Sequence, residues 1–144
     1  MDSVKKLKTE SGLSLYHPWV SFVYFAAVIA GTLLFIHPVF VAVSLLCAIF
    51  ASAMINGRKT VFATLGFGIP MFIFIALANP LFNHRGATIL FYLFDNPVTL
   101  EAIVYGIVSA GMMFAAVIWF TCYNTVVTSD KFIYIFGRIL PSIA

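Results

Sequence analysis

The sequence predicts an all-α membrane protein with four transmembrane helices and with both ends on the cytoplasmic side. Of its 144 residues, 62% are hydrophobic and only 9% are charged, whereas a soluble domain carries roughly 25% charged residues. A water-soluble fold of this size could not bury so much apolar side chain. The topology follows from the long uncharged stretches and from the basic residues that gather on one side of them.

Two proline breaks delimit the first two predicted spans. Residues 1–10 are polar and basic, and the apolar stretch that follows Pro18 is too long for a signal-peptide core, so we expect residues 1–17 to be a retained cytoplasmic tail. Span one covers about residues 19–36 and follows Pro18, whose missing N–H costs little in a first helical turn. His37-Pro38 ends this span, and span two covers about residues 39–55, before the turn signal Asn56-Gly57.

Span three, about residues 61–78, contains Pro70, which is expected to kink the helix because it removes one backbone hydrogen bond. Asn79-Pro80 is expected to end the span. Glycines in spans three and four are expected to let neighbouring helices approach closely; these are Gly66, Gly68, Gly106 and Gly111.

Residues 79–101 form the irregular, external part of the predicted fold. The apolar run 87–94 is too short to cross a membrane as a helix, and it is compatible with a re-entrant piece, an interfacial helix or a short hairpin. Asp95-Asn96-Pro97 is expected to be a turn. Thr99 is the expected N-cap of span four, about residues 102–122, and Glu101 in its first turn suits the helix dipole.

The basic residues orient the four spans. Seven of the eight lysines and arginines fall on one side, namely Lys5, Lys6, Lys8, Arg58, Lys59, Lys131 and Arg138, and Arg85 alone falls on the other. The positive-inside rule then places both termini in the cytoplasm. The net charge of +3 does not indicate nucleic-acid binding, because the basic residues are few and lie in short clusters between apolar stretches.

The last stretch of the chain, residues 128–144, is predicted to be an amphipathic cytoplasmic helix. Ser129 and Asp130 can cap its start, and Pro141 is expected to end it. Its apolar side chains recur at helical spacing, away from Lys131 and Arg138; they are Phe132, Ile133, Phe136, Ile139 and Leu140.

No catalytic or metal constellation stands out. His17 and His37 lie at opposite ends of span one, and His84 has no His-x-x-His or Glu-x-x-His partner. Cys47 and Cys122 lie in apolar stretches without Cys-x-x-Cys spacing, as buried structural thiols do. The spans contain only single hydroxyls, and each can bond its own helix backbone; they belong to Ser21, Ser44, Ser52 and Ser109. The prediction is therefore a non-enzyme without cofactor.

Two segments, NPLFNHRGATILF and PVTLEAIVYG, resemble the T component of energy-coupling factor (ECF) transporters, the family that includes the cobalt transport protein CbiQ. The matching positions are Asn79, Pro80, Phe82, His84, Gly86, Thr88, Leu90, Thr99, Glu101 and Gly106. The segment TSDKFIYIFGRILPSIA resembles the cytoplasmic helix that follows the fourth span in that family, with Ser129, Asp130 and Pro141 in the matching places.

The resemblance implies a transmembrane coupling subunit of an importer for vitamins or transition-metal ions. Such a subunit links two cytoplasmic ABC-type ATPases to a substrate-binding membrane protein, the S component, and neither hydrolyses ATP nor selects the substrate. It also implies that residues 124–144 begin the cytoplasmic coupling region. The candidate coupling surface comprises Ser129, Asp130, Phe132, Phe136, Ile139, Leu140 and Pro141.

The chain departs from the family in two places. The family's ATPase-docking motifs, short Ala-Arg-x sequences, lie beyond the matched region, and no Ala-Arg dipeptide occurs here, so we expect a truncated or degenerate member. Gly111-Met112-Met113 stands where many relatives carry an arginine. The alternatives are a stand-alone four-span transporter or channel, and a membrane enzyme, which would both use His84 with Asp95 or Glu101.

Overall fold

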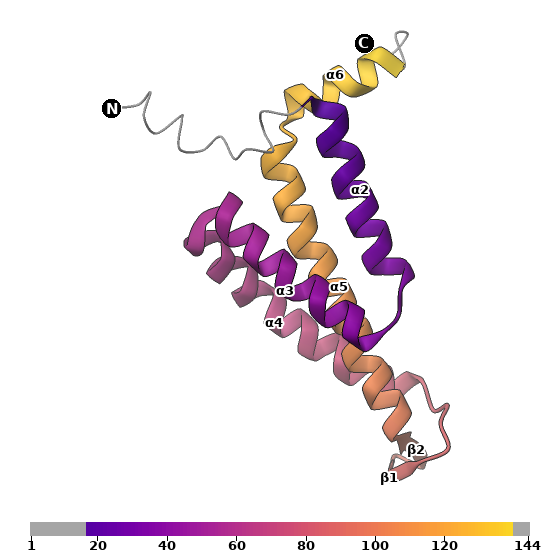
Figure 1. Ribbon diagram of the computed structural model, residues 1–144. Helices are drawn as coiled ribbons and strands as arrows, with labels where there is room; N and C mark the ends of the chain where they lie inside the picture. Colours follow the sequence, from indigo (N-terminus) through magenta and orange to yellow (C-terminus); the bar gives the residue numbers. More distant parts are fainter. Residues whose placement is uncertain (1–16, 140–144) are drawn as a thin grey trace.

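The computed structural model describes residues 17–139, which form five helices and one β-hairpin (Figure 1). In chain order the elements are α2 (Pro18–Leu34), α3 (Pro38–Ile55), α4 (Gly57–Phe82), β1 (Ile89–Leu93), β2 (Asn96–Thr99), α5 (Leu100–Val126) and α6 (Ser129–Ile139).

Helix α5 is the central element of the fold. α2 packs along the half of α5 that leads to its C-terminal end, whereas α3 and α4 lie side by side and cross the other half (Figure 1). α6 lies across the end where α5 finishes and α2 begins, and the hairpin lies at the opposite end of α5 (Figure 1).

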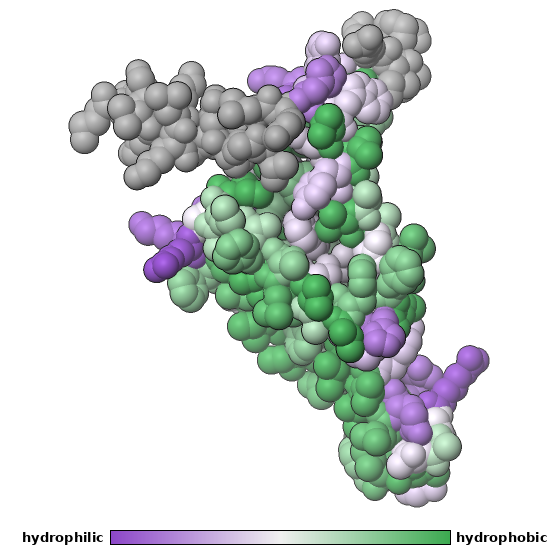
Figure 2. All heavy atoms as spheres, viewed as in Figure 1, coloured by the Kyte–Doolittle hydropathy of each residue, from purple (hydrophilic) through white to green (hydrophobic). Residues whose placement is uncertain are grey.

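Three of these helices, α3, α4 and α5, are long and apolar enough to cross a membrane, which indicates a membrane protein. α2 is equally apolar but has 17 residues, which rise about 26 Å. Large apolar side chains are exposed along α3 and α4, among them Phe50, Phe62 and Phe74. In the space-filling view, apolar residues cover these helices and polar residues gather at the periphery (Figure 2).

The predicted breaks around the first two spans are confirmed. α2 begins at Pro18, and Nδ1 of the preceding His17 accepts a 3.4 Å hydrogen bond from the backbone N–H of Trp19. α3 begins at Pro38. A single residue, Asn56, then separates α3 from α4, and Gly57 at φ +80° makes the reversal, because glycine adopts a positive φ without steric cost.

The expected end of span three at Asn79-Pro80 is wrong, because α4 continues through both Pro70 and Pro80 to Phe82. Pro80 cannot donate to the carbonyl of Ala76, four residues earlier, but near a helix end this loses only one bond. The backbone N–H of Asn83 still donates to the carbonyl of Asn79 at 2.8 Å and closes the last turn.

Of the three possibilities for the irregular segment, the structure shows a hairpin. β1 pairs antiparallel with β2, with Leu93 opposite Asn96. The turn therefore consists of Phe94 and Asp95, and the predicted turn at Asp95-Asn96-Pro97 is displaced, since Asn96 and Pro97 belong to β2.

The buried core lies around α5. Phe25 of α2, Ala48 of α3 and Trp119 of α5 belong to it. The expected close approach of helices at the glycines is confirmed in part. A Cβ at Gly68 would collide with the ring of Phe114, whereas a Cβ at Gly66 would meet nothing within 4 Å.

Candidate functional site

The segment that resembles the ECF family folds into a compact junction between the end of α4, the hairpin and the start of α5. We call this set of residues, Asn79, Pro80, Gly86, Thr99, Glu101 and Gly106, the junction site. Its members come from separate parts of the chain, and two groups of contacts bring them together.

The first group joins α4 to α5. Nδ2 of Asn79 donates a 2.8 Å hydrogen bond to Oγ of Ser109, which in turn donates to the carbonyl of Gly106 at 3.1 Å. A Cβ at Gly106 would lie 2.8 Å from the carbonyl oxygen of Ala76 and 2.9 Å from Cβ of Asn79. Gly106 thus lets α5 approach the carbonyl that Pro80 leaves without a helical partner.

The second group ties the loop after α4 to the first turn of α5. Both carboxylate oxygens of Glu101 accept from the backbone N–H of Thr88, at 3.2 and 3.3 Å. Oγ1 of Thr99 accepts from the N–H of Ala102 at 3.3 Å and donates to the carbonyl of Arg85 at 3.3 Å. The expected N-cap role of Thr99 and first-turn place of Glu101 are therefore confirmed.

Gly86 fits closely against the same two side chains. A Cβ at this position would lie 2.5 Å from Oε2 of Glu101 and 2.6 Å from Oγ1 of Thr99. Those distances are shorter than normal van der Waals contact, so a side chain here would displace the carboxylate from the Thr88 N–H. The need for glycine at position 86 thus follows from packing.

Phe82 and His84 stand apart from these contacts. The ring of Phe82 is 87% exposed. Nδ1 of His84 is buried, and among the side chains of residues 17–137 it is the one buried nitrogen or oxygen for which the structure shows no hydrogen-bond partner. Across the same residues, no group of three or more His, Cys, Asp or Glu side chains is placed to hold a metal ion. The Glu101 carboxylate instead caps the loop through Thr88.

A buried hydrogen-bonded chain, which sequence reasoning missed, connects α2, α3 and α5. Nε1 of Trp119 donates to Oγ of Ser44 at 3.2 Å, and Ser44 shares a 2.8 Å bond with Oγ1 of Thr32. The Thr32 hydroxyl donates to the carbonyl of Val28 at 2.8 Å, so the Ser44 hydroxyl must donate to Thr32. Ser109 bonds its own helix as expected, through the carbonyl of Gly106, and both Ser44 and Ser109 also bond across helices, which the sequence did not indicate.

α6 presents the candidate coupling surface. The helix begins at Ser129 and has Asp130 in its first turn. Its buried residue is Ile135, at 1% exposure, whereas three members of the predicted apolar stripe, Phe132, Ile133 and Phe136, are exposed. The stripe is therefore not covered by the described part of the chain. Ile139 is the last helical residue, and Leu140 and Pro141 lie outside the described residues.

Two contacts, in the first half of the helix, hold α6 in place. Nζ of Lys131 donates to the carbonyl of Val126 at 3.4 Å, at the C-terminal end of α5, where a cation is favoured by the helix dipole. The ring of Tyr134 packs edge-on against His17, with centroids 6.3 Å apart. A groove of about 710 Å³ opens between α2, α5 and α6, and Phe22, Tyr123 and Ile133 are among the residues that line it.

No protein-family model matches this chain, and neither a curated protein nor a solved structure shows significant similarity to it. The resemblance to the ECF family therefore rests on the residues of the matching segments. The arrangement of those residues is the basis for the proposal that follows.

Proposed function

We propose that this protein is a transmembrane coupling subunit of an ECF-type importer, which links cytoplasmic ABC-type ATPases to a substrate-binding S component in the membrane. The observation that carries the proposal is the junction site. Asn79, Gly86, Thr99, Glu101 and Gly106 are positions of the resemblance, and each makes or permits a close contact there. A set of residues that fixes one helix on another suits a subunit that transmits force rather than one that performs chemistry.

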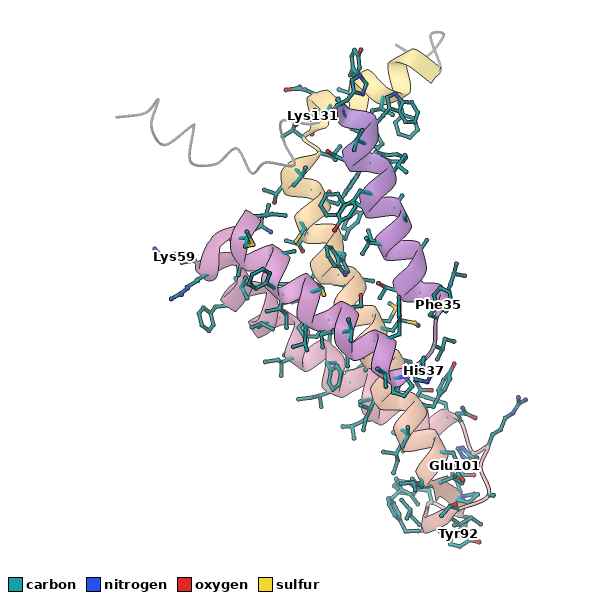
Figure 3. All side chains as sticks on the ribbon, in the orientation of Figure 1. Phe35, His37, Lys59, Tyr92, Glu101 and Lys131 are labelled. Carbon is teal, nitrogen blue, oxygen red and sulfur yellow. The ribbon has the colours of Figure 1, made fainter. Side chains whose placement is uncertain are left out.

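In this proposal α2 crosses the membrane as well as α3, α4 and α5, which gives four spans, and both termini lie in the cytoplasm. Lys59, in the first turn of α4, and Lys131, in α6, both lie away from the hairpin (Figure 3), whereas Arg85 lies in the loop before the hairpin. This distribution supports the orientation because lysine and arginine concentrate on the cytoplasmic side of membrane proteins.

The exposed stripe of α6 is the proposed contact with the ATPases. Ile135 anchors the helix to the bundle, while Phe132, Ile133 and Phe136 remain exposed beside the groove. Aromatic side chains of this kind serve as anchors in protein interfaces. The apolar outer faces of α3 and α4 are the proposed contact with the S component, since both lie within the membrane in this orientation.

Co-purification tests the proposal. The affinity-tagged product of the full-length gene would be co-expressed with the ABC-type ATPases and S components of the same genome and purified in mild detergent. We expect an ATPase pair to be retained, and we expect Phe132→Glu combined with Phe136→Glu to lower that retention several-fold, because two carboxylates would have to be desolvated at the contact.

Phe94→Ser provides the matched control, since it also removes an exposed aromatic ring, at the end of the molecule opposite α6. This variant is expected to retain the ATPases fully. Failure of the unaltered chain to retain any ATPase would contradict the proposal. Uptake of a solute by the purified chain alone in liposomes, lost on Glu101→Gln, would instead favour the stand-alone transporter.

A further inference from the structure

The β-hairpin carries an apolar surface that the rest of the chain does not cover. All five residues of β1, from Ile89 to Leu93, are exposed, and all are apolar or aromatic. A strand with one face in water normally alternates apolar and polar residues, and β1 does not. The hairpin is held by β2 instead, where Val98 and Thr99 are buried against the helices.

The turn of the hairpin also exposes an apolar side chain, and its backbone is strained as well. Phe94 has φ +51° and Asp95 has φ +63°, as both central residues of a type I′ turn require, and such turns favour Asn-Gly or Asp-Gly. A bulky residue at positive φ is uncommon. The ring of Phe94 is also 90% exposed, so contacts within the described chain do not offset that cost, and the strain points to a role outside it.

The position of the hairpin indicates what covers it. Tyr92 lies at the far end of the molecule from Lys131, beyond Glu101 (Figure 3). The hairpin leads directly into α5, one of the three helices able to cross a membrane, and the neighbouring exposed side chains Phe82 and Leu100 continue the apolar surface of α4 and α5 towards it. In the space-filling view, apolar residues extend to this end of the molecule (Figure 2).

We propose that the hairpin is an interfacial anchor that inserts Tyr92 and Phe94 into the lipid leaflet on its side of the membrane. The two-stranded sheet has unpaired backbone groups along its outer edges, which the hydrocarbon core does not tolerate. At the headgroup boundary, water reaches those groups while aromatic rings enter the acyl region, as they do in aromatic belts. The anchor requires only that the chain is a membrane protein, so it is independent of the coupling function.

Tryptophan fluorescence in vesicles tests the anchor. Phe94→Trp and, as a matched control from the loop before the hairpin, Arg85→Trp would be reconstituted in phosphatidylcholine vesicles with lipids brominated near the top of the acyl chain, or with iodide on both sides of the membrane. The signal of Trp19 and Trp119, measured on the unaltered protein, would be subtracted. We expect bromolipid to quench the tryptophan at position 94 several-fold more than that at position 85, and iodide to show the reverse order.

Two results would overturn the anchor. Strong quenching of position 94 by iodide together with weak quenching by bromolipid would place the tip in water. Protection of position 94 from both quenchers would place it against protein, as in contact with an S component or a second copy of this chain. Phe94→Trp retains an aromatic residue at the same backbone position, and Tyr92→Trp repeats the measurement at a residue whose φ is not positive, so a folding defect in one variant does not leave the question open.

Discussion

Ser44 is the residue at which three helices meet. Its hydroxyl accepts a hydrogen bond from Trp119 of α5 and donates one to Thr32 of α2, so each of these three side chains has a partner. The sequence showed a single serine in an apolar helix, and the usual partner of such a hydroxyl is its own backbone. No local pattern could predict the bond to Trp119, 75 positions away, because it depends on how the helices cross.

Replacing Ser44 with alanine is therefore expected to destabilise the protein. The indole N–H of Trp119 would lose its acceptor in a buried site, and the free energy of unfolding should fall by about 1 kcal/mol. Denaturant titration in mixed micelles measures this change. Thr125→Ala, which removes a hydroxyl that bonds only within α5, should cost less, and Ser44→Ala combined with Trp119→Phe should cost less than the sum of the single changes. Additive losses would show that the bond contributes nothing.

Gly86 gives a second prediction at the scale of one residue. Gly86→Ala would place Cβ against Oγ1 of Thr99 and the carboxylate of Glu101, and the repacking should cost about 1–3 kcal/mol. Gly66→Ala is the matched control, because a Cβ there meets nothing within 4 Å and alanine favours a helix interior by up to about 1 kcal/mol. Melting temperatures in detergent should therefore move in opposite directions. Equal shifts would argue against the close packing at Gly86.

At the scale of the elements, apolar runs and their breaks predicted all five helices, whereas their ends and the hairpin depended on tertiary contacts. The signal at Asn79-Pro80 is a genuine helix breaker in local terms, yet α4 passes through it because Asn79 bonds Ser109 and Gly106 packs against the same turn. The run 87–94 could not be assigned, since both faces of β1 are apolar and the alternation that identifies a strand is missing.

The turn of the hairpin allows a prediction that separates folding from lipid binding. Phe94→Gly removes a side chain from a residue at φ +51°, which should stabilise the turn by about 1 kcal/mol. Amide hydrogen exchange of β1 and β2 should accordingly become slower. Tyr92→Gly is the control, because glycine within a strand weakens it and exchange should become faster. Faster exchange in Phe94→Gly would mean that the phenyl ring itself supports the hairpin.

At the scale of the whole molecule, the membrane character of the chain was predictable from composition. Whether α2 also crosses the membrane is harder to predict, because this helix is short. α2 has one residue fewer than the shortest of the three helices able to cross, α3. It runs along α5 from the end that carries α6 to about the middle of that helix (Figure 1). A helix of about 26 Å spans most of a hydrocarbon core of about 30 Å, and the non-helical residues 35–37 link it to α3.

The orientation of the molecule follows if α2 crosses. His17 and Lys59 should then lie in the cytoplasm and Asp95 outside, because the chain reverses after α2 and again between α3 and α4. Cysteines would be introduced at these positions in a Cys47→Ala, Cys122→Ala background and labelled in intact cells with a membrane-impermeant thiol reagent. We expect labelling of Asp95→Cys alone, and labelling of all three after permeabilisation. Labelling of His17→Cys as well would show that α2 does not cross. Labelling of Lys59→Cys without Asp95→Cys would show that the molecule has the opposite orientation, with the coupling surface of α6 outside the cytoplasm.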